Sequence, residues 1–106
     1  MEKHLATLKT KLEKNQAVLF DVREQEEWDE GYLKDAFFVP LSQLNLGNIP
    51  ANTEKTKDQE IYLYCRSGQR VYIAQPILED MGFKKVTPLD EGFEELRDEG
   101  FAAVEP

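Results

Sequence analysis

Cysteine and histidine are scarce in this sequence, with one residue of each type among 106. A single cysteine can form neither an internal disulfide nor a zinc site of several cysteines, so we expect no metal and no cofactor. No segment approaches the ~20 apolar residues that a membrane-spanning helix needs. Residues 1–16 are charged and lack the apolar core of a signal peptide. Since a lone thiol suits a reducing compartment, we expect a cytoplasmic protein without a membrane partner.

Positive charge is also in short supply. The chain has 13 Lys and Arg against 21 Asp and Glu, which gives a net charge of −8 at pH 7. Because phosphate backbones repel such a chain, nucleic acid is not an expected partner. The hydrophobic fraction of 41% and the supply of aromatic residues argue against disorder. The length then predicts one domain with one core over residues 1–106.

Helical and strand-like patterns alternate along the chain. Apolar residues at helical spacing, or short segments ended by glycine, predict helices near residues 5–12, 24–30, 42–46, 69–81 and 91–99. Short apolar runs predict strands at residues 17–22, 36–39, 60–64 and 85–88. Residues 47–59 are polar and read as a surface connection. This alternation is typical of an α/β domain with a largely parallel sheet.

Cys65 directly follows the predicted strand 60–64 and precedes the predicted helix from residue 69. In open α/β sheets ligands bind at the carboxyl ends of the strands, and a following helix directs backbone N–H groups and a positive dipole end toward them. Gly68 allows the tight turn that such a loop requires. A thiol at this place should ionise readily, since its thiolate is the anion that the loop stabilises.

A structural interpretation stands beside this one. Free cysteine is among the most buried residue types, so Cys65 could be a small core residue, and Arg66 and Arg70 could be exposed charges. A core cysteine, however, has no need of a following turn with glycine and two arginines. The context therefore favours a reactive thiol.

Three ordered groups of residues lie within positions 17–100. They are the first group of Asp21, Val22, Arg23, Glu27, Gly31, Ala36 and Pro40, the loop 65–70, and the last group of Ala74, Leu78, Gly82, Phe83, Val86, Leu89 and Gly92. Together they resemble the signatures of the rhodanese family. The resemblance implies a rhodanese-like α/β fold, with a central, mostly parallel sheet flanked by helices on both faces.

The resemblance also implies a function. Cys65 would be catalytic: its thiolate would take a sulfane sulfur from a small anionic donor such as thiosulfate, hold it as a persulfide, and release it to a thiol or to cyanide. Substrate binding would fall to the remaining loop residues Arg66, Ser67, Gly68, Gln69 and Arg70. Their amides would cradle the persulfide, and the two arginines would orient the donor.

Loop length separates this activity from a related one. The loop has the pattern C-x4-R, whereas the related phosphatases of cell-cycle control have C-x5-R. The shorter loop leaves too little room for a phosphate group. Two alternatives stay open: a sulfur relay that takes persulfide from a protein partner, and a binding module without turnover. The intact Cys65 and complete loop disfavour the latter.

The chain departs from the family pattern at several positions. Tyr32 stands where the family commonly has His, Asp35 and Glu91 where it has Gly, Val71 where it has Ser, and Leu96 where it has Trp. These departures leave the thiol chemistry intact. We further expect a structural ion pair of Arg23 with Asp21 or Glu27, and a surface position for His4.

Overall fold

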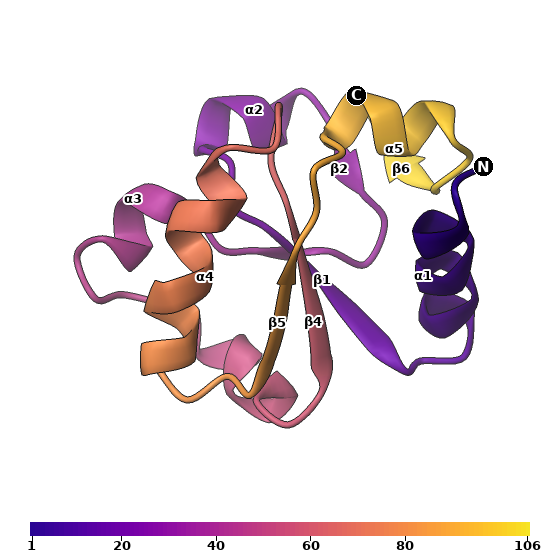
Figure 1. The fold of residues 1–106 in the computed structure, drawn as a ribbon. Coiled ribbons are helices and arrows are strands. Elements are labelled where there is room, and N and C mark those ends of the chain that lie inside the picture. Colours follow the sequence, from indigo (N-terminus) through magenta and orange to yellow (C-terminus); the bar gives the residue numbers. More distant parts are fainter.

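A computed structural model describes residues 1–106 and shows a four-stranded sheet at the centre of the chain (Figure 1). Strand β1 (Ala17–Asp21) pairs in parallel with β3 (Phe37–Phe38) and with β4 (Glu60–Tyr64). Strand β4 pairs in parallel with β5 (Lys85–Pro88), so the order is β3-β1-β4-β5. Both the four strands and the parallel sheet predicted from the sequence are confirmed.

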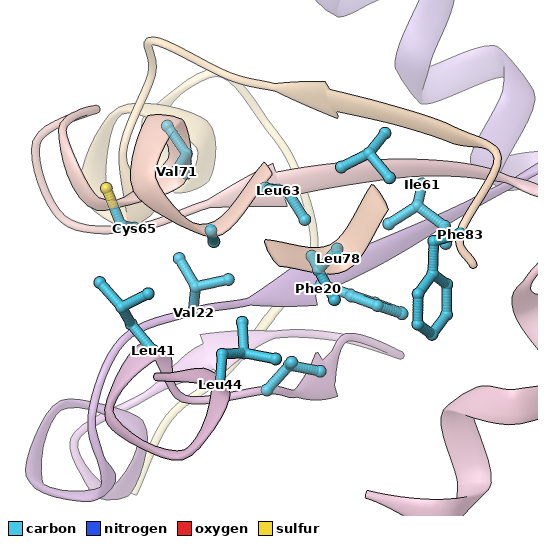
Figure 2. Close-up of a cluster of buried hydrophobic side chains, with 13 residues drawn as sticks. Phe20, Val22, Leu41, Leu44, Ile61, Leu63, Cys65, Val71, Leu78 and Phe83 are labelled. Carbon is cyan, nitrogen blue, oxygen red and sulfur yellow. The ribbon is translucent and has the colours of Figure 1, made fainter. Parts of the chain in front are cut away.

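One face of the sheet is covered by α3 (Leu41–Leu44) and α4 (Arg70–Asp80). Phe20 of β1 and Leu63 of β4 point to this face, where thirteen buried residues form one cluster (Figure 2). Cys65 belongs to the same cluster. The strand that precedes the candidate site is thus fixed by packing on this side.

The opposite face is covered by α1 (Lys3–Glu13) and α5 (Phe93–Asp98). Leu19 and Tyr64, each next in sequence to residues of the first cluster, belong to a second cluster of nine buried residues on this side. The division follows from strand geometry, because successive side chains point to opposite faces. Helices therefore flank both faces, as the resemblance implied.

Shorter elements complete the fold. Helix α2 (Gln25–Asp29) follows β1, and a 3-10 helix spans Ala51–Thr56. Strands β2 (Tyr32–Leu33) and β6 (Ala103–Val104) form a separate antiparallel pair. The sequence did not predict this pair, because two-residue strands are too short to show a period. None of the helices combines the length and apolarity that crossing a lipid bilayer requires.

Two of the departures from the family pattern have local explanations. Asp35, which stands where the family has Gly, keeps the left-handed backbone conformation with φ of 65°. Aspartate tolerates that region better than most side chains do. Tyr32, in place of His, stacks on Trp28 with ring centroids 3.7 Å apart. Both substitutions therefore fit this fold.

Candidate functional site

The loop between β4 and α4 places Cys65 at the carboxyl edge of the sheet. The residue is only 1% exposed, and the backbone N–H of Gly68 donates a hydrogen bond to its Sγ at 3.1 Å. Figure 2 shows the sulfur turned away from Val22 and Leu41, at one end of the apolar cluster. Cys65 is thus both a core residue and a thiol that meets a loop amide, so the two interpretations of the sequence are compatible.

Gly68 allows the loop to close on the sulfur. Its φ is +82°, a left-handed conformation that favours glycine. A Cβ at this position would lie 2.4 Å from the carbonyl oxygen of Asp90, which is a steric clash. Glycine is therefore required here twice, once for the backbone angle and once for the contact.

The segment between β5 and α5 supports the loop from behind. The N–H of Phe93 donates to the carbonyl of Cys65 at 2.9 Å. A Cβ on Gly92 would lie 1.9 Å from the carbonyl oxygen of Arg66, so the two backbones are in direct contact. The resemblance included Gly92, but nothing in the sequence near the cysteine indicated that this glycine supports its loop.

The two loop arginines have different environments. Arg70 donates from both terminal nitrogens to Glu27, at 2.6 and 2.8 Å, a bidentate pair that links the start of α4 to α2. Arg66 is exposed and forms no ion pair within the chain. Of the two side chains expected to orient an anion, Arg66 is therefore the one without a protein partner.

The predicted structural ion pair involves Arg23 and Asp21. The two buried side chains are 2.7 Å apart, and Arg23 also donates to the carbonyl of Gly31 at 2.7 Å. The alternative partner, Glu27, is bound to Arg70 instead. The buried network fixes the carboxyl end of β1, next to the candidate site.

The Arg70 guanidinium lowers the pKa of Glu27 from its ordinary value of 4.5 to about 2. A carboxyl group with a depressed pKa stabilises the fold fully above its unfolded-state pKa, and this contribution is lost as pH falls through the folded-state value. The pair should therefore be at full strength above about pH 5 and should weaken between about pH 4.5 and 2.

Glu27→Gln should lower the free energy of unfolding by about 1–2 kcal/mol at neutral pH, less than the full shift implies because solvent reaches the pair. Denaturant unfolding at a series of pH values measures this loss. The two proteins should converge as pH falls toward about 2. The exposed neighbour Glu26 offers a matched control, and a Glu26→Gln variant with the same pH-dependent loss would argue against the Arg70 pair as its source.

A pocket of about 300 Å³ lies beside the loop. It is rich in charge of both signs and is lined by Arg23, Glu27, Glu30, Arg66, Phe93, Glu94 and Arg97. Arg66 directly follows Cys65, and the N–H of Phe93 donates to the Cys65 carbonyl, so the pocket adjoins the backbone of the Cys65 loop. Glu30 and Glu94 could not be recognised from the sequence as pocket residues, because they resembled ordinary solvated helix residues.

His4 lies on α1, half exposed, as predicted. Its Nε2 is 2.9 Å from a carboxylate oxygen of Glu91, and this contact raises the pKa of the imidazole. Glu91 is one of the residues that stand where the family has glycine. The histidine is therefore engaged by this carboxylate on the α1 and α5 side of the sheet.

Known proteins share both the sequence pattern and the fold. The family model of the Rhodanese-like domain matches residues 4–99. The Bacillus subtilis protein named "Putative sulfurtransferase YtwF" is 39% identical over 83 residues, which cover 76% of each chain. The "Putative sulfur carrier protein YrkF" of the same organism is 30% identical over 77% of this chain, which corresponds to 43% of its own length.

Solved structures agree. The human single-domain sulfurtransferase TSTD1 superimposes with a TM-score of 0.73 at 25% identity, over 89% of this chain and 92% of its own. The rhodanese-like domain of the Anabaena protein Alr3790 gives a TM-score of 0.77 over 96% of this chain and 76% of its own; at 23% identity this shows a shared fold. The loop geometry, the parallel sheet and these matches lead to one conclusion: the chain belongs to the rhodanese-like domain family.

Proposed function

We propose that this protein is a sulfurtransferase that carries a sulfane sulfur as a persulfide on Cys65. One observation carries the proposal: the only thiol of the chain accepts a hydrogen bond from the Gly68 amide inside a six-residue loop at the carboxyl edge of the sheet. Membership of a family with sulfurtransferases among its named members supports the same class of reaction.

Loading of the thiol is a displacement at sulfur. The Cys65 thiolate attacks the outer sulfur of thiosulfate, a new S–S bond forms, and the S–S bond of the donor breaks with its electron pair leaving on sulfite. Arg66, which has no partner in the chain, binds the anionic oxygens of the donor. The Gly68 N–H, together with the amides of Ser67, Gln69 and Arg70, stabilises the negative charge that develops on the persulfide.

In the second half of the reaction, the Cys65 persulfide is the sulfur donor. An acceptor, either cyanide or a thiolate, attacks the outer sulfur of the persulfide, and the electron pair of the broken S–S bond returns to Cys65 Sγ. Thiosulfate with cyanide should therefore give thiocyanate and sulfite in equal amounts, with one persulfide intermediate per chain. Catalytic formation of thiocyanate is the experiment that tests this activity, and its absence under conditions that load the thiol would contradict turnover.

A sulfur relay is the second candidate, and two observations favour it. One relative is named as a sulfur carrier protein, and the net charge of −8 opposes the approach of a small dianion. A relay would load faster from a persulfidated protein donor than from thiosulfate. Comparing the two loading rates by the mass of the intact protein separates the candidates, since an enzyme acting on thiosulfate should show the opposite order.

A further inference from the structure

The pocket beside the Cys65 loop holds three charged side chains that no other group of the chain neutralises. Three of its lining charges are in ion pairs: Arg23 binds Asp21, Glu27 binds Arg70, and Arg97 binds Glu105 at 3.0 Å. Arg66, Glu30 and Glu94 take part in no ion pair or side-chain hydrogen bond. The free charge of the pocket is therefore one positive group and two negative groups.

The two free carboxylates come from separate elements that meet near the loop. Glu30 follows the last residue of α2, and Glu94 lies in the first turn of α5. Figure 1 shows α2, α5 and the loop between β4 and α4 at the same end of the molecule. The fold thus brings two acidic groups and the nucleophile to one end of the sheet.

Local structure gives no reason for an acidic residue at position 30. A negative charge at the carboxyl end of a helix interacts unfavourably with the backbone carbonyls there, and no cation of the chain compensates Glu30. Glu94 is more readily explained by its place near the start of α5. A ligand with positive charge would give both carboxylates a partner.

We propose that Glu30 and Glu94 select an acceptor thiol that carries a positively charged group close to its sulfur. This proposal rests on the proposed sulfur transfer. The reaction has two halves, and its two substrates need opposite charges in the same pocket. Arg66 binds the anionic donor in the first half. After sulfite has left, Glu30 and Glu94 hold the ammonium group of the acceptor in the second half.

Transfer to the acceptor forms one S–S bond and breaks another. The acceptor thiolate attacks the outer sulfur of the Cys65 persulfide, and the bond between that sulfur and Sγ breaks. Its electron pair returns to Cys65 as thiolate, and the product is the persulfide of the acceptor. The carboxylates take no part in bond making. They raise the local concentration of a cationic thiol and lower that of an anionic one.

The test uses protein that is first loaded with sulfur, with the persulfide verified by intact mass before any acceptor is added. The rate of persulfide loss is then measured with three small thiols: cysteamine, which is cationic, 2-mercaptoethanol, which is neutral, and 3-mercaptopropionate, which is anionic. Each rate for the double variant Glu30→Gln/Glu94→Gln is divided by the wild-type rate for the same thiol, so that differences in intrinsic nucleophilicity cancel.

In the double variant we expect the rate with cysteamine to fall by about threefold to tenfold, the rate with 2-mercaptoethanol to stay unchanged, and the rate with 3-mercaptopropionate to rise. The contrast should fade at high ionic strength. The double variant Glu79→Gln/Asp80→Asn, at the far end of α4, is the matched control for net charge and should leave all three ratios near one.

The same factor for all three thiols would overturn the proposal, and so would an equal effect of Glu79→Gln/Asp80→Asn. Neither result would contradict sulfur transfer by Cys65, because the persulfide is verified before the acceptor is added. A short cysteinyl peptide with lysine next to the cysteine extends the comparison. A larger fall with this peptide than with cysteamine identifies a protein segment as the cationic acceptor, and a smaller fall identifies a small aminothiol.

Discussion

Cys65→Ser should abolish sulfur transfer while leaving the fold in place. Serine has nearly the volume of cysteine, so packing at the end of the apolar cluster is retained. A hydroxyl is not ionised at neutral pH and cannot hold a sulfane sulfur, so no persulfide forms. Thiocyanate formation from thiosulfate and cyanide should fall to the uncatalysed rate, a larger effect than that of any other single substitution.

The control for this variant is its stability. Cys65 is 1% exposed, so the polar hydroxyl costs some folding free energy unless the Gly68 amide, which now donates to Sγ, donates to the hydroxyl. Circular dichroism and denaturant unfolding should show a folded protein. Residual turnover in a folded Cys65→Ser protein would contradict the assignment of the nucleophile.

Gly92→Ala should have the second largest effect, although this residue does not touch the thiol. The added methyl group would lie 1.9 Å from the Arg66 carbonyl oxygen, and the two backbone segments are held together by the hydrogen bond from the Phe93 N–H to the Cys65 carbonyl. The clash can be relieved only by moving the loop. We expect a loss of about 1–3 kcal/mol in stability from overpacking. We also expect at least a hundredfold loss of turnover, because the loop amides leave their positions around the sulfur.

Gly47→Ala is the matched control. Gly47 has φ of +80° and open space around its Cα, so alanine there should destabilise the protein through backbone strain and leave the site intact. Comparing Gly92→Ala with Gly47→Ala therefore separates a loss of turnover from a loss of stability. Wild-type turnover in Gly92→Ala would show that the β5–α5 segment does not hold the loop.

The sheet could be predicted because its four strands are short apolar runs and its main helices carry periodic leucines such as Leu5 and Leu8. The place of Cys65 followed from the same pattern, since it comes directly after a strand and before a helix. The bounds of β4 and β5 match, and the others differ by at most two residues, as for α5, which was expected over 91–99 and spans Phe93–Asp98. Terminal turns depend on hydrogen bonds that a pattern does not encode.

Contacts between residues far apart in the chain could not be predicted from the sequence. Arg70 could be recognised as a loop arginine, but its pairing with Glu27 joins residues 43 positions apart. Gly92 is required by contact with Arg66, and the strands β2 and β6 are far apart in the chain. Each of these contacts depends on how the helices fold back onto the sheet, and that arrangement is a property of the whole fold.

The mass of the intact protein after incubation with thiosulfate shows whether Cys65 carries a sulfur atom. We expect a gain of one sulfur atom per chain, located by peptide mapping to Cys65, reversed by cyanide or a reducing thiol, and absent in Cys65→Ser. If no adduct forms with thiosulfate or with a persulfide donor, both the sulfurtransferase and the relay are contradicted.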